Sequence, residues 1–403
     1  MDRRHARRVI GFINAAHVID HMHLLIFPTA LLGMIGTFGM SYGEMLALSL
    51  GGFIAFGAGS LPSGWLGDKW SRRNMMAIFF IGIGVATVLV AFAKTAFMIA
   101  AALTLVGLFA SIYHPVGTAM LTSHAETEKL GWEIGVNGVW GNLGVAFAAL
   151  VAGGLTQYIG WQVAFVVPGL ISIGVGVAFL AMVPDIAVPK RPGKKAADLP
   201  RATVIRAFAV LALVTVAGGI VFNATTVTLP KVFDERLTGL ASSPFGVGAF
   251  AFAVYTIGAT SQLIVGRLVD RHSLRTVFMP LSALQAPCLF LAIYAWDWAM
   301  VAFGIGMMFA VFGQVTINDA IVAKYTDDRW RARAYSVRYF VSFGASALAV
   351  PLVAVLHGTG ADGGFGAVFL ALAIFGALVF IGACFMPHRP DEVAPKPAAQ
   401  PAE

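Results

Sequence analysis

The first apolar stretch of the chain carries ionisable residues at helical spacing. His17, Asp20 and His21 stand at positions i, i+3 and i+4, so on a helix they lie on one face. Asp20 follows the basic residue Arg8 by 12 residues, about 18 Å along a helix, which is near the middle of a bilayer about 30 Å thick. Ionisable groups at that depth are costly and usually mark a functional site. Imidazole and carboxylate groups exchange protons readily, so these three residues are predicted to be proton-coupling residues.

His114 is predicted to be the fourth proton-coupling residue. It stands ten residues before His124 in a later apolar stretch, which gives it a similar depth, and Pro115 follows it. A proline inside a helix removes a hydrogen bond and frees a carbonyl group. Histidine and carboxylate also suit divalent transition metals, but the first stretch offers only two histidines on one face. No metal and no cofactor are therefore predicted.

Long apolar stretches must position these side chains. Hydrophobic residues make up 58% of the 403 residues, charged residues 12%, and mean hydropathy is +0.81; soluble domains carry about 25% charged residues. Only helices and closed barrels satisfy the backbone in lipid, and barrel strands would alternate in polarity. The sequence therefore predicts an all-α membrane protein with twelve transmembrane helices, at about 9–36, 44–66, 74–93, 96–121, 133–155, 161–183, 205–230, 246–266, 276–295, 298–323, 334–356 and 365–386.

Basic residues predict the orientation. With the N-terminus inside the cell, most of the 27 Lys and Arg residues fall in cytoplasmic loops and tails, as the positive-inside rule requires. We therefore expect a multi-pass protein of the cytoplasmic (inner) membrane with both termini in the cytoplasm. The net charge of +7 is explained by this topology and does not indicate binding to nucleic acid.

The chain repeats itself at an offset of 202 residues, since the stretch 64–73 returns as 266–275. This predicts two pseudo-symmetric six-helix bundles, at 1–183 and 205–386. Residues 184–204, rich in Pro, Lys and Ala, are expected to form a cytoplasmic linker, and residues 387–403 a disordered cytoplasmic tail.

The repeated stretch resembles the signature loop of the major facilitator superfamily. It reads Gly-x-Leu-x-Asp-Lys-x-Ser-Arg-Arg over 64–73, and the resemblance to that family extends over the whole chain. It implies a conformational latch on the cytoplasmic side, made by Gly64, Asp68, Arg72, Arg73, Gly266, Asp270 and Arg275. His17 and Asp20, the segment 27–32 and the run 113–115 resemble the fosmidomycin-resistance-like branch of drug exporters. That branch has Asn before the aspartate where this chain has Ile19.

Polar residues of helices 4, 7 and 10, which line the central cavity of the resembled fold together with helix 1, are predicted to bind the solute, as are residues of helices 5 and 11. These candidates are Tyr113, Asn137, Trp140, Asn223, Gln314, Asn318 and Arg338. Asn223 stands 202 residues after His21, so the second half is polar there but cannot titrate. Arg338 has two interpretations: it pairs with Asp319 of the adjacent helix, or it attracts an anionic group of the solute.

The predicted function is proton-coupled secondary active transport of a small organic solute by alternating access, as an exporter. Proton-coupled uptake of a small organic anion is the alternative, and transport of a divalent metal is a weaker one. No Gly-x-x-x-x-Gly-Lys-Ser/Thr motif is present, which argues against ATP as the driver. No nucleophile with a partnered histidine stands at a recognisable spacing, so an enzyme is not predicted. The expected partners are the solute, protons and the bilayer, and a monomer is the superfamily's usual form.

Overall fold

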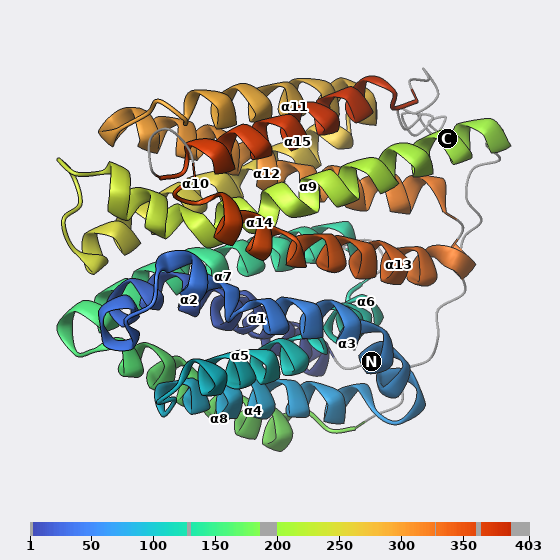
Figure 1. The fold of residues 1–403 in the computed structure, drawn as a ribbon. Helices are drawn as coiled ribbons and strands as arrows, with labels where there is room; N and C mark the ends of the chain where they lie inside the picture. The colour runs from blue at the N-terminus through green and yellow to red at the C-terminus, as the bar shows by residue number, and fades with distance from the viewer. Residues whose placement is uncertain (1–2, 127–129, 186–199, 327, 360–363, 388–403) are drawn as a thin grey trace, which may run out of the picture.

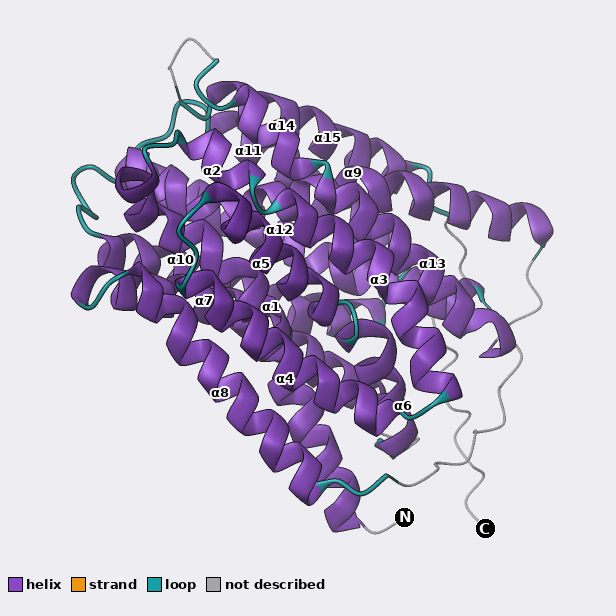
Figure 2. Cartoon of the chain, turned by 60° about the horizontal axis from the view of Figure 1, so that its bottom comes forward, coloured by secondary structure: helices purple, strands orange, loops and turns teal. Residues whose placement is uncertain are grey.

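The computed structural model describes residues 3–126, 130–185, 200–326, 328–359 and 364–387, and every regular element in these ranges is a helix. Twelve helical segments there are long and apolar enough to cross a membrane. In Figure 1, the helices α1–α8 form the lower part of the molecule and α9–α15 the upper part. Figure 2 shows helices running side by side, with loops gathered at their ends.

In the described residues, the N-terminal half contains nine helices that form the first six spans. They are α1 (Arg3–Phe38), α2 (Tyr42–Ala47), α3 (Leu50–Lys69), α4 (Arg72–Ala91), α5 (Ala96–Ala110), the π-helix η1 (Tyr113–Gly117), α6 (Thr118–His124), α7 (Leu130–Tyr158) and α8 (Trp161–Met182). Two spans are composite: α2 with α3 forms the second, and α5, η1 and α6 together form the fourth.

The described part of the C-terminal half contains seven helices that form the other six spans. They are α9 (Arg201–Arg236), α10 (Pro244–Val269), α11 (Leu274–Leu291), α12 (Asp297–Tyr325), α13 (Asp328–Ala347), α14 (Ala349–Leu356) and α15 (Gly366–Cys384). The eleventh span combines the end of α13 with α14. The predicted linker falls largely, and the predicted tail almost wholly, outside the described residues, and the domain boundaries stay a prediction.

Several helices extend beyond their predicted ends, and the two longest do so most. The first was expected at about 9–36 and runs over Arg3–Phe38, and the seventh was expected at 205–230 and runs over Arg201–Arg236. Hydropathy detects only the part of a helix that lies in lipid, whereas the helix itself continues into water wherever no residue ends it. Arg236, which the sequence placed in a loop, is buried at the end of α9 and donates to the carbonyl oxygens of Ala292, Ile293 and Ala295.

The two halves repeat the same helix pairing. In the first half α1 packs on α7, α3 on α5 and α4 on α8; in the second α9 packs on α13, α10 on α12 and α11 on α15. Between the halves, α7 packs on α10 and α3 on α13. This order agrees with the offset of 202 residues seen in the sequence.

We call the two ends of the molecule the terminal end and the far end. The terminal end is where α1 and α9 begin and α8 and α15 finish; there Arg8 donates to the carbonyl of Met182, and Arg206 donates to that of Phe385. At the far end the halves are in close contact. A Cβ atom added to Gly43 of α2 would lie 2.8 Å from the carbonyl oxygen of Ala354 in α14. The Cα of Gly248 in α10 lies 3.3 Å from the position of a Cβ on Gly153 in α7.

A third glycine crossing joins α3 to α5 inside the first half. A Cβ on Gly107 would lie 2.8 Å from the Cα of Gly52 and closer still to its carbonyl oxygen. We expect Gly107→Ala to lower the stability of the protein by about 1–3 kcal/mol, because backbone cannot move aside as a flexible side chain can. Thermal unfolding in detergent measures this. Gly174→Ala is the control, since a Cβ there meets nothing within 4 Å; equal melting of the two variants would contradict the prediction.

Candidate functional site

A π-helical turn places His114. Pro115 has no N–H group, and the helix widens into a π-turn over Tyr113–Gly117. The N–H of Val116, next to the proline, still donates to the carbonyl of Ile112 at 3.2 Å, as in an α-helix. The predicted irregularity at Pro115 is confirmed. The glycines of α3 allow this wide turn to pack closely: a Cβ on Gly64 would lie 3.2 Å from Cβ of Pro115. π-turns within α-helices occur frequently at functional sites.

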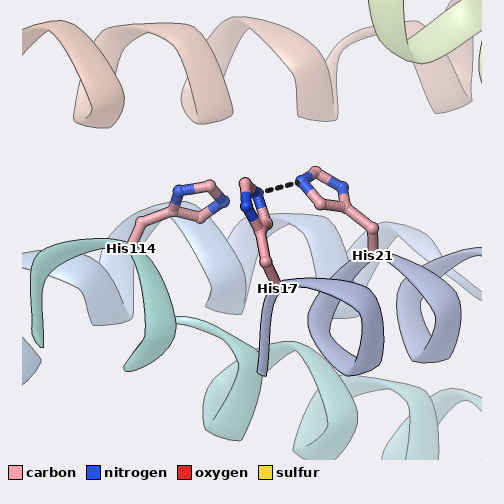
Figure 3. Close-up of side chains that lie close together, drawn as sticks. All are labelled: His17, His21 and His114. Carbon is pink, nitrogen blue, oxygen red and sulfur yellow. Dashed lines mark hydrogen bonds between the residues drawn. The ribbon is translucent and has the colours of Figure 1, made fainter. Parts of the chain in front are cut away.

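Three histidine rings converge beside this turn (Figure 3). Nδ1 of His17 lies 2.7 Å from the carbonyl oxygen of Asn137. A carbonyl oxygen only accepts, so this nitrogen carries the proton and Nε2 of His17 is left as an acceptor. Nε2 of His21 lies 3.1 Å from that nitrogen. The ring of His114 stands edge-on to both, with centroid distances of 5.5 Å and 5.7 Å.

Asp20 is fully buried beside the same cluster. Its Oδ2 lies 3.5 Å from Nε2 of His114, too far for a hydrogen bond of normal geometry. Among the residues that the structure describes, neither carboxylate oxygen has a hydrogen-bond partner. The sequence suggested His17 or His21 as the partner of Asp20, and the nearest imidazole nitrogen given by the structure belongs to His114 on another helix. The four predicted titratable residues therefore come together at one place.

Asn137 of α7 organises the cluster through both ends of its amide. The hydroxyl of Tyr113 donates to its Oδ1 at 3.0 Å, and its Nδ2 donates to Oδ1 of Asn14 at 2.9 Å. The ring of Tyr113 also lies 4.7 Å from that of His17. Tyr113 and Asn137 thus hold the histidine cluster in place. Trp140, one turn further along α7, is 41% exposed.

Arg338 and Asp319 form an ion pair between α13 and α12, as one of the two predicted interpretations required. The pair is linked to the histidine cluster through Tyr339. The Cζ of Arg338 lies 5.2 Å from the centre of the Tyr339 ring, and that ring lies 5.4 Å from the ring of His114. Polar and aromatic contacts therefore run without a break from one half of the molecule into the other.

Aromatic residues of α13 are part of this seam and were missed by the sequence analysis. Phe343 lies 5.1 Å from the ring of His114 and 4.2 Å from that of Phe56 in α3. The signal that could have found them is their spacing, because Tyr335, Tyr339 and Phe343 stand four residues apart and so share one face of a helix. Asn14, three residues before His17, was also missed.

Three other predicted solute-binding residues lie in the second half, and two of them hold helices together. Asn223 donates to the carbonyl of Ser346 at 2.7 Å, which ties α9 to α13. Gln314 donates to Oε1 of Gln285 at 2.9 Å, which ties α12 to α11. Asn318 is half-buried next to Asp319, and its Oδ1 has no hydrogen-bond partner within the described ranges. A role for these three in binding solute stays a prediction.

The signature loop is held by short polar contacts at the terminal end. Arg72 pairs with Asp68 at 2.6 Å across the loop between α3 and α4, so the partner of Asp68 is in its own loop. Arg73 donates to the carbonyls of Leu180 and Val183 at the end of α8.

The corresponding loop of the second half is less tightly packed. Asp270 ends α10, Arg275 donates to the sulfur of Met279 at 3.4 Å, and a Cβ on Gly266 would meet nothing within 4 Å. The latch role of both loops stays a prediction.

The histidine cluster also has the geometry of a metal ligand set. One ring nitrogen from each of His17, His21 and His114 lies within 4.8 Å of the other two. The first helix supplies two histidines on one face, as predicted, and η1 supplies a third that the sequence did not indicate as a ligand.

Twelve membrane-crossing helices in two equivalent halves, with titratable side chains buried where the halves meet, define a multi-pass membrane transporter. The chain belongs to the Major Facilitator Superfamily, whose family model matches residues 14–261 and 243–403. The predicted fold class is thereby confirmed, and members of this family are transporters and not enzymes. The resemblance to the fosmidomycin-resistance-like branch stays a prediction.

Individual relatives are distant. The chain is 31% identical over 128 residues to the membrane sensor protein UhpC of Salmonella typhimurium, a match that covers 31% of this chain and 28% of that protein. It is 23% identical to a probable sugar efflux transporter of Pasteurella multocida, over 94% of this chain and 92% of that one.

Among solved structures, the chain matches a bacterial homologue of the human lysosomal transporter Spinster, crystallised in an inward-facing, occupied conformation. The TM-score is 0.76 at 15% identity, over 96% of this chain and 97% of that one. A likeness at this identity shows a shared fold.

Proposed function

We propose that this protein is a proton-coupled secondary active transporter that exports a small organic solute by alternating access. In this cycle the two halves rock around a site at mid-membrane and open it to each side in turn. A proton gradient drives the solute outward, and the protein works as a monomer in the cytoplasmic membrane.

The observation that carries this proposal is the state of Asp20. A buried charge is costly, so a carboxyl group that has no hydrogen-bond partner among the described residues indicates a function rather than a contribution to stability. His114 is the nearest imidazole, and His17 and His21 adjoin it. Together they provide a site that can take a proton from one side and release it to the other.

The two halves then have different tasks. The cluster of His17, Asp20, His21 and His114 lies in α1 and η1, whereas the second half offers Arg338, paired with Asp319, and the amides of Asn223, Gln314 and Asn318. We assign proton handling to the first half and most solute contacts to the second half. Tyr113, Asn137 and Trp140 are assigned solute contacts from the first half. The signature loops are assigned the role of the cytoplasmic latch.

The positive-inside rule supports a cytoplasmic terminal end, where Arg8, Arg73 and Arg206 bind backbone carbonyls. The far end would then face the outside of the cell. Export is favoured by the resemblance to drug exporters and by the relative named as a sugar efflux transporter. Uptake of an organic anion with protons remains the alternative, because Arg338 suits an anion in either direction.

A divalent metal cargo is the second candidate, and the spacing of the three histidine nitrogens favours it. Purified protein in liposomes distinguishes the two functions. We expect a pH gradient to drive accumulation of an organic solute, and we expect no accumulation of Zn²⁺ or Co²⁺ under the same gradient. Equal solute flux with and without the gradient would disprove proton coupling, and gradient-driven metal accumulation would replace the organic cargo.

A further inference from the structure

Arg338 retains binding capacity that its ion pair does not use. The side chain is 7% exposed, and its Nη1 donates to Asp319. Its Nε–H group has no hydrogen-bond partner among the described residues. A guanidinium offers five N–H donors in a planar fork that matches a carboxylate. A buried donor without a partner is unfavourable, which indicates that a further acceptor binds there during function.

Parallel aromatic rings lie next to this guanidinium. Tyr335 and Tyr339 stack at 6.1 Å with 22° between their planes, and Tyr339 and Phe343 at 5.7 Å with 12°. The row runs along α13 on the seam between the halves, where Tyr339 and Phe343 both contact His114. Offset parallel rings provide flat apolar faces that favour another planar ring.

We propose that the solute is a planar aromatic carboxylate that binds Arg338 through its anionic group and Tyr339 or Phe343 through its ring. This inference rests on the proposed function, since it names the chemical class that the transporter moves. A saturated carboxylate of equal charge could bind the guanidinium but could not stack on the aromatic rings. A neutral aromatic amide could stack on the rings but would not form the ion pair with the guanidinium. The site therefore requires both features in one molecule.

Asp319 competes with the solute's carboxylate through charge, because its ion pair with Nη1 neutralises the guanidinium that attracts the anion. It keeps the buried guanidinium paired during the return step, and the incoming anion binds on the side of the unpartnered Nε–H. Affinity for the solute then depends on a competition inside the protein. Asp319→Asn removes the competitor and should strengthen binding of the anion at least fivefold, whereas a purely structural ion pair predicts lower stability and no gain in binding.

Binding to detergent-purified, full-length protein tests the substrate class without any transport step. The probes are 2-naphthoate, the saturated decalin-2-carboxylate, the neutral 2-naphthamide and the cationic 2-naphthylmethylammonium, measured by calorimetric titration. We expect 2-naphthoate to bind at least fivefold more tightly than each of the other three. Binding of decalin-2-carboxylate as tight as that of 2-naphthoate would overturn the role of the aromatic rings.

Variants separate the two contacts. Arg338→Gln combined with Asp319→Asn removes both charges, so no lone buried charge is left to unfold the protein; we expect at least a tenfold loss of 2-naphthoate affinity. Tyr339→Leu should reduce the preference for 2-naphthoate over decalin-2-carboxylate to about twofold or less. Tyr294→Leu, at a residue 72% exposed and remote from the seam, is the control and should bind like the unchanged protein.

Failure of this inference differs from failure of the proposed function. If 2-naphthoate does not bind while another solute follows the pH gradient in liposomes, the substrate class is wrong and the transporter stands. If 2-naphthoate binds as expected but no solute responds to the gradient, the binding site stands and proton coupling is wrong.

Discussion

Asp20→Asn is expected to abolish accumulation of solute driven by a pH gradient, while exchange of solute for solute continues. Asparagine keeps the size of the side chain but cannot carry a proton. The part of the transport cycle in which the protein carries a proton back across the membrane therefore stops. Solute exchange needs no net proton movement and should survive. Counterflow and gradient-driven flux, measured in the same liposomes, report the two activities separately.

The control for this prediction is Asp234→Asn. Asp234 also lies on a membrane-spanning helix, but it is at the far end and pairs with Lys231 at 2.7 Å. That variant should keep gradient-driven accumulation. His114→Gln provides a further comparison, because it leaves Asp20 in place and removes the imidazole closest to it. Accumulation by Asp20→Asn at the level of the unchanged protein would exclude Asp20 from the mechanism.

Gly248→Leu is expected to open the far end and to suppress transport. Gly248 and Gly153 allow α10 and α7 to touch backbone to backbone, and a side chain has no space there. Overpacking costs about 1–3 kcal/mol, which is roughly a 5- to 160-fold shift in the ratio of closed to open far ends. A conformation open at the far end releases the contact, so the protein accumulates in that conformation and the cycle slows.

Distances between spin labels measure this shift directly. Labels at Ile159 and Tyr294, which are 67% and 72% exposed at the far end of opposite halves, should move apart in Gly248→Leu. Gly174→Leu is the matched control, since a Cβ added at Gly174 would meet nothing within 4 Å. This variant should leave the label distance and the transport rate unchanged. An unaltered distance distribution in Gly248→Leu would show that the crossing tolerates a side chain.

The fold was predictable because lipid permits few alternatives. Hydropathy alone locates twelve spans. The structure differs at the ends of helices such as α1 and α9, which lie in water where hydropathy carries no information, and in the breaks within the second, fourth and eleventh spans. The convergence of His17, Asp20 and His21 was predictable from their spacing. The predicted depth of His114 in the membrane placed it level with these residues. The similar depths of Asp319 and Arg338 likewise predicted that the two could pair.

Contacts between helices were less predictable. Nothing in the local sequence of α13 states that Tyr339 and Phe343 face His114, because this depends on how the two halves dock. The interpretation of Asn223 as the polar equivalent of His21 was incomplete for the same reason. Its amide is used to hold α9 against α13, a contact that appears only once both helices are packed.

The fourth span has one more consequence. Its α5 segment is fastened to α3 at the crossing of Gly52 and Gly107, whereas its α6 segment begins only after the π-turn at Tyr113–Gly117. The span therefore consists of two helical segments connected by the π-turn, and His114 lies in that turn. Movement of α6 at the terminal end can turn the imidazole of His114 while α5 stays in place. A short local rotation, and not displacement of a whole helix, is then sufficient to connect or disconnect Asp20 from its nearest imidazole.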